Sequence, residues 1–61
     1  MKVGDIIKLH SSTRRNGRFA GLIGLIVGFD ENRHAGLEIN VGGEMRNFHV
    51  TQVAEVINES R

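Results

Sequence analysis

The sequence predicts an all-β fold, a small closed barrel of five short strands. Short apolar segments with a period of two recur along the chain, and glycine, asparagine and serine turn signals separate them. Gly21, Gly24 and Gly28 interrupt one long apolar segment, as in a strand that bends at a barrel corner. The chain of 61 residues has room for one domain, which we expect over residues 1–57, with residues 58–61 as a frayed tail.

Residues 2–10 form the first expected strand. Val3, Ile7 and Leu9 share the face that should point to the core, and Ile6 falls on the opposite face. The first strand is therefore expected to carry apolar side chains on both faces.

A long loop is expected over residues 10–20. Its tip is predicted at Asn16-Gly17, a pair that tolerates the positive φ angles of a two-residue type I′ turn. Such a turn would set Arg15 directly opposite Arg18, and two facing cations cost stability unless they diverge or share an anion. This local cost indicates a functional loop.

Residues 22–29 have the pattern of a central strand that is apolar on both faces. Leu25, Val27 and Phe29 fall on one face and are expected in the core. The aliphatic side chains of the other face are then left for the outside of the barrel.

Two strands joined by a tight turn follow. Residues 37–41 alternate apolar and polar side chains, the pattern of a half-buried antiparallel strand. Gly42-Gly43 supplies a two-residue hairpin turn to residues 44–50. In this next strand, Phe48 is expected to face the core.

The end of the chain allows two interpretations. Val53, Val56 and Ile57 have the i, i+3, i+4 spacing of a helix face. We favour one tight helical turn over residues 51–53 and a closing strand over residues 54–57, because an unpaired sheet edge invites association with other chains.

Positive charge is concentrated near the N-terminus, although the net charge is only +1. Residues 1–18 carry a net charge of +4, and residues 19–61 carry −3. The charged loop either serves solubility or binds an anion, and both interpretations stay open. The candidate residues for binding nucleic acid or another anion are Arg14, Arg15, Arg18, Phe19 and Arg46. Among them, Phe19 is the candidate ring for stacking on a base.

The composition disfavours several classes of protein. Cysteine is absent and the three histidines lack metal-site spacing, so we expect no metal, no cofactor and no catalytic residue. A barrel of this size has little room for a water-excluding pocket, so we expect neither an enzyme nor a small-molecule substrate. The longest apolar run is too short to span a bilayer and the N-terminus lacks a secretory pattern, which predicts a cytoplasmic protein without a membrane partner.

The aliphatic side chains outnumber the places in so small a core. The surplus predicts an apolar outer patch that contacts a protein partner or a second copy of the chain. Its expected members are Ile6, Leu22, Ile23 and Ile26.

Five short strands, a long first loop and a tight turn before the last strand together resemble an SH3-like barrel. Residues 19–27, in which Gly21 and Gly24 precede alternating apolar residues, are similar to the core motif of the KOW domain of ribosomal proteins and transcription elongation factors. Ala20 stands where that family usually has a lysine, so an RNA-binding role implied by the resemblance would rest on the arginines. The chain also resembles small SH3-like proteins of bacteriophages, which would locate it in a virion.

Two functions follow from these features. The leading hypothesis is a non-enzymatic binding module whose arginine-rich loop contacts nucleic acid or an acidic protein surface. The alternative is a structural or assembly protein of a virion or scaffold, acting by homo- or hetero-oligomerisation.

Overall fold

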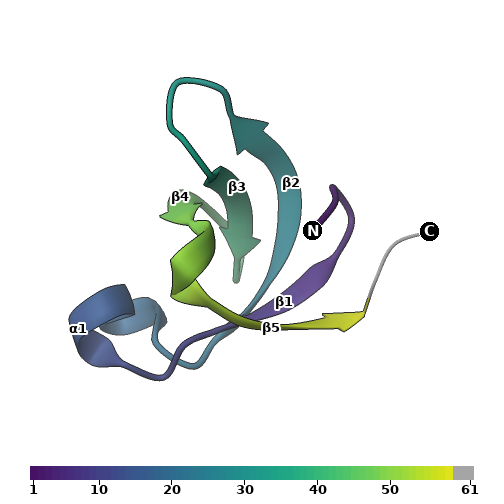
Figure 1. Ribbon diagram of the computed structural model, residues 1–61. Coiled ribbons are helices and arrows are strands. Elements are labelled where there is room, and N and C mark those ends of the chain that lie inside the picture. The colour runs from purple at the N-terminus through teal and green to yellow at the C-terminus, as the bar shows by residue number, and fades with distance from the viewer. Residues whose placement is uncertain (59–61) are drawn as a thin grey trace.

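The computed structural model describes residues 1–58, which form one antiparallel sheet of five strands with one short helix and two 3₁₀ turns (Figure 1). The strands are β1 (Ile6–Leu9), β2 (Ile23–Asp30), β3 (Gly36–Val41), β4 (Glu44–His49) and β5 (Val53–Asn58). Helix α1 (Thr13–Asn16) and the turn η1 (Gly17–Phe19) lie between β1 and β2, and the turn η2 (Val50–Gln52) joins β4 to β5.

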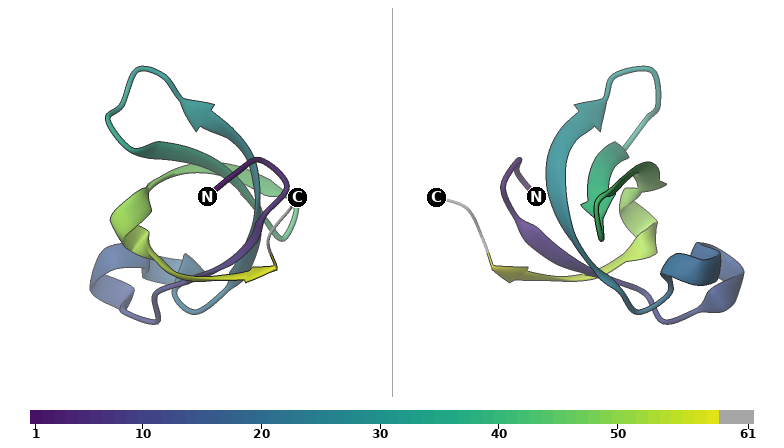
Figure 2. Two further views of the ribbon diagram at one scale, coloured as in Figure 1. Left: turned by 45° about the vertical axis from the view of Figure 1, so that its right-hand side comes forward. Right: turned by 180° about the vertical axis from the view of Figure 1, so that it is seen from behind.

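The sheet has the strand order β4-β3-β2-β1-β5 and curls round its own interior (Figure 2). This architecture is compatible with a small all-β barrel, and the predicted all-β class is confirmed. The tight turn before the last strand is also confirmed, because η2 leads into a strand rather than a helix. Asn58 ends β5, and residues 59–61 of the expected tail lie outside the described residues.

The core occupies the inner face of the curled sheet. Strand β3 contributes Leu37, Ile39 and Val41, in the predicted alternation. Gly42-Gly43 then makes the predicted turn, with φ angles of 59° and 89°. The described residues bury seven apolar side chains: Ile7, Leu9, Ile26, Leu37, Ile39, Val41 and Phe48.

Strand β2 faces the opposite way to the predicted one. Ile26 is fully buried and Leu25 is 41% exposed, so the prediction of Ile26 in an outer patch is wrong. Gly24 causes the difference, because it points inward where an added Cβ would lie 2.5 Å from Cγ2 of Ile39. Only glycine fits there, and the period of two then carries Ile26 into the core.

Phe29 is 50% exposed, so its predicted core position is also wrong. Strand β1 pairs with β2 only at residues 23–25 of β2. Further along β2, a β-bulge shifts the register with β3 between Ile26 and Gly28. The far end of β2 therefore extends past β1, and its phenylalanine is left partly uncovered.

The first loop is helical rather than a hairpin. Thr13–Asn16 forms α1, and Asn16 has a φ of −117°, so the predicted type I′ turn at Asn16-Gly17 is wrong. Arg15 and Arg18 do not form the expected facing pair, because they bond to different strands and turns. The physical reason is tertiary: the Asn16 side chain is buried against another part of the chain.

Candidate functional site

The predicted anion-binding residues lie on α1, η1 and β4. We call Arg14, Arg15, Arg18 and Arg46 the arginine surface. Helix α1 projects from one end of the molecule, away from the loop between β2 and β3 (Figure 1). All four arginines are exposed.

Asn16 holds the helix that carries Arg14 and Arg15. Only 5% of Asn16 is exposed. Its Nδ2 donates to the carbonyl oxygens of His10, at 2.9 Å, and Gln52, at 3.2 Å, while its Oδ1 accepts from Gln52 Nε2 at 2.9 Å. These hydrogen bonds fasten α1 to η2 across 36 residues of sequence.

Gln52 extends the same network on both sides. Its Nε2 also donates to the Arg15 carbonyl oxygen at 2.9 Å, and Arg15 Nη1 donates to the Thr51 carbonyl oxygen at 2.9 Å. The Oε1 atom of Gln52 accepts a hydrogen bond from the His49 backbone N–H at 2.8 Å, and the Thr51 backbone N–H donates to His49 Nδ1. Together these two hydrogen bonds form a capping box for η2. Helix α1 therefore rests on a turn that is itself fixed.

Two guanidinium groups meet at the Glu44 carboxylate. Arg18 donates to both of its oxygens, at 3.0 and 2.6 Å. Arg46 donates to Oε2 from Nε at 3.1 Å, and its Nη2 lies 3.0 Å from the same oxygen in an ion pair. The hydrogen bond from Arg18, followed by that from Arg46, lowers the pKa of Glu44 to about 2. The same hydrogen bond raises the pKa of Arg18.

Phe19 links this ion cluster to the core. Its ring is half-buried and meets Phe48 edge to face, with centroids 5.8 Å apart. The Arg18 guanidinium carbon lies 4.3 Å from the Phe19 centroid, and that of Arg46 lies 5.9 Å away. The predicted stacking platform is thus already covered by an arginine, and its ring packs against the core.

Arg14 differs from the other three arginines. Within residues 1–58, its side chain makes no hydrogen bond or ion pair. The structure therefore brings Arg18, Phe19 and Arg46 together around Glu44, and leaves Arg14 beside Arg15 on α1.

Glu44, Asn16 and Gln52 also belong to the site, although they were not predicted as members of it. Glu44 carried a local signal, because residues i and i+2 of a strand share a face and Glu44 precedes Arg46 by two. The pairing of Asn16 with Gln52 carried none.

The outer face of the sheet exposes a different set of apolar residues from the predicted patch. Leu22 and Ile23 are exposed as expected, but Ile6 is only half-exposed. Leu25 pairs with Asn40, which pairs with Met45, so Leu25 and Met45 lie in one row across the sheet. We call Ile23, Leu25, Val27 and Met45, all exposed, the apolar strip.

A hollow of about 330 Å³ lies between the ion cluster and the start of the apolar strip. Arg18, Phe19 and Glu44 line one part of it, and Leu22 and Ile23 line another. The arginine surface and the apolar strip are therefore neighbours.

The described residues contain no group of three or more side chains able to hold a metal ion. In the same part of the chain, no helix has the length and apolar character needed to cross a membrane. Comparisons with models of protein families, with curated proteins and with solved structures gave no match.

Proposed function

We propose that this chain is a non-enzymatic SH3-like binding module whose arginine surface contacts the phosphates of nucleic acid. The observation that carries the proposal is the net positive charge of the arginine surface, part of which lies on a helix that hydrogen bonds hold in place. Among the described residues, Glu44 is the acid that forms ion pairs within the arginine surface, with Arg18 and Arg46, so the four arginines and Glu44 together carry a formal charge of +3. The hydrogen bonds of Asn16 fix the helix beneath Arg14 and Arg15, so less side-chain and loop entropy is lost on binding.

The arginines offer donors that match a phosphate group. A guanidinium presents a planar fork that bonds two oxygens at once, and Arg14 keeps its whole fork available. Arg18 and Arg46 share one carboxylate, and each guanidinium keeps further N–H donors for a phosphate. Since Arg18 covers the Phe19 ring, base stacking contributes little and sequence preference should be weak.

The resemblance to the KOW domain implies RNA as the nucleic acid, and the short apolar run predicts the cytoplasm as the location. The strand order and the 3₁₀ turn before β5 are compatible with an SH3-like barrel and so with that resemblance. An acidic protein surface is the other ligand that the same guanidinium groups would accept.

Salt-dependent binding tests this function. Fluorescence anisotropy with short RNA and DNA duplexes that lack terminal phosphates should give a log–log salt slope of about −2 to −3, the value for two or three phosphate contacts. The double variant Arg14→Gln, Arg15→Gln should reduce the slope by up to about 2. Lys8→Gln, which removes one cation from β1, serves as the control and should leave the slope unchanged. Equal losses in both variants, or no binding at low salt, would contradict the proposal.

The apolar strip favours a second function, assembly through the outer face of the sheet. A structural or scaffold protein, or a virion component as the phage resemblance implies, would cover Ile23, Leu25, Val27 and Met45 with a second copy or another protein. Sedimentation at micromolar concentration tests it. Ile23→Glu should dissociate the assembly, and Ile57→Glu, an equally exposed position on β5, should not. A monomer at all concentrations would remove this alternative.

A further inference from the structure

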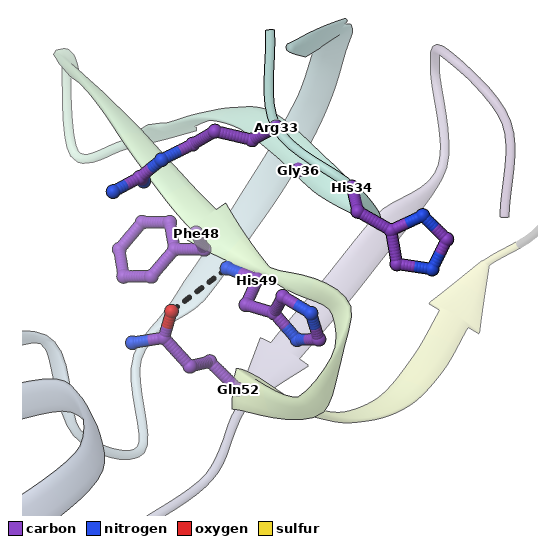
Figure 3. A pocket seen from close by; sticks show the side chains of 6 residues that line it. All are labelled: Arg33, His34, Gly36, Phe48, His49 and Gln52. Carbon is purple, nitrogen blue, oxygen red and sulfur yellow. Dashed lines mark hydrogen bonds between the residues drawn. The ribbon is translucent and has the colours of Figure 1, made fainter. Parts of the chain in front are cut away.

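A second concave site lies between the β2–β3 loop and η2. Its pocket of about 350 Å³ falls within the size range of small-molecule sites. Among residues 1–58, no acidic side chain lines it. Its lining residues are Arg33, His34, Gly36, Phe48, His49 and Gln52 (Figure 3).

The hydrogen bonds around His49 define which ring nitrogen carries its proton in the neutral form. The Thr51 backbone N–H donates to Nδ1 at 3.1 Å, and a backbone N–H can only donate. Nδ1 is therefore the acceptor, and Nε2 carries the hydrogen as a donor. The capping box of η2 thus fixes His49 as a hydrogen-bond donor through Nε2.

Arg33 supplies a second, uncommitted donor group. Its guanidinium makes no hydrogen bond or ion pair with any other residue of the described range 1–58. The loop returns tightly at Gly36, where an added Cβ would lie 2.9 Å from Cβ of both Arg33 and Asp30. Arg33 is therefore held close to the start of β3. Figure 3 shows Arg33 and His34 diverging from the loop, with Phe48, His49 and Gln52 across from them.

We propose that this pocket binds the phosphate group of a nucleotide. Its cationic and donor side chains come from two separate segments, which suits a tetrahedral anion with several acceptor oxygens better than a planar carboxylate. Phe48 adds an apolar wall for the rest of the ligand. The phosphate can belong to a free nucleotide or to the end of an oligonucleotide. This site is separate from the arginine surface and goes beyond the function proposed above.

Amide chemical shifts of the ¹⁵N-labelled full chain test the proposal during titration with inorganic phosphate and with adenosine monophosphate. We expect saturable shifts in residues 33–36 and 48–52. Arg33→Gln should weaken binding about tenfold or more, as the loss of a charge-assisted hydrogen bond does. Arg14→Gln is the matched control, and the dissociation constant should not change. Both positions are exposed and neither side chain makes a hydrogen bond or ion pair with a described residue, so both variants should fold.

The outcomes separate the two sources of phosphate and the two sites. Shifts with a 5′-phosphorylated oligonucleotide, and none with its unphosphorylated form, would identify a nucleic-acid end as the ligand. Shifts with the mononucleotide alone would identify a free nucleotide. Binding of the mononucleotide would stand even if oligonucleotides without terminal phosphates fail to bind, in which case only the arginine-surface proposal falls. No saturable shift at these residues, or an equal loss in Arg14→Gln and Arg33→Gln, would overturn the pocket proposal.

Discussion

The two long loops of this molecule are ordered by different means. The first loop, between β1 and β2, is held by Asn16, whose buried side chain bonds to a turn 36 residues away. The loop between β2 and β3 is held mainly by short-range hydrogen bonds, such as Asn32 N to Asp30 Oδ1 at 3.0 Å and Arg33 N to the Asp30 carbonyl oxygen at 3.2 Å. One backbone hydrogen bond, from Val50 N to the Ala35 carbonyl oxygen at 3.0 Å, ties its end to η2.

This difference separates tertiary from local order. The first loop is fixed only when the rest of the fold is complete, and its arginines are then presented on a firm support. The second loop takes most of its hydrogen bonds from its own residues and carries a strained backbone at Ala35, where φ is +56°. Breaking a contact in each loop should therefore have unequal effects.

The largest effect is expected at Asn16. Asn16→Ala removes three hydrogen bonds of a nearly fully buried side chain, two to the carbonyl oxygens of His10 and Gln52 and one from Gln52 Nε2, so the free energy of unfolding should fall by about 2–3 kcal/mol. Urea unfolding measures the loss. Asn47→Ala is the control, because its exposed amide makes one long bond of 3.4 Å to Asp30, and little change is expected there. Comparable losses in the two variants would remove the distinction between the loops.

A smaller effect of opposite sign is expected at Ala35. Ala35→Gly relieves the left-handed backbone strain but adds entropy to the unfolded chain, for a net gain of roughly 0.5 kcal/mol. Thermal unfolding should show a raised midpoint. Ala54→Gly, on β5, is the matched control and should lower it. A lowered midpoint in both variants would mean that the second loop stores no strain.

The third effect concerns Glu44, which anchors η1 from the outside. Because the folded-state pKa of Glu44 is lowered from 4.5 to about 2, its stabilisation is present above about pH 4.5 and is lost as the pH falls toward 2. The effect should be small, since the side chains of Arg18 and Glu44 are 62% and 43% exposed. Unfolding of wild type and Glu44→Gln across this range measures it. If the difference in the free energy of unfolding between wild type and Glu44→Gln grew as the pH falls, the lowered pKa of Glu44 would be contradicted.

The same contrast explains how much the sequence could predict. Strand β3, the Gly42-Gly43 turn and the buried Phe48 follow from local alternation and turn chemistry, and the structure agrees with each. The facing of β2 depends on the space that Ile39 leaves at Gly24, which is a contact between strands. A local pattern could not choose between the two faces of a segment that is apolar on both.

The candidate site divides in the same way. Arg14, Arg15 and Arg18 were predicted from a concentration of charge. The two-residue spacing of Glu44 and Arg46 carried a signal that was not used. The helix at Thr13–Asn16 was not predicted, because asparagine suits both an exposed turn and a buried hydrogen-bonded position. The distant contact with Gln52, which the local sequence does not show, favours the buried position.

The most direct test of the arginine surface as a phosphate-binding site is the duplex affinity of the wild-type chain at about 50 mM and about 200 mM salt. Two or three phosphate contacts predict a fall of about 12- to 40-fold between these conditions. An affinity that is the same at both concentrations, or undetectable at the lower one, would contradict the account.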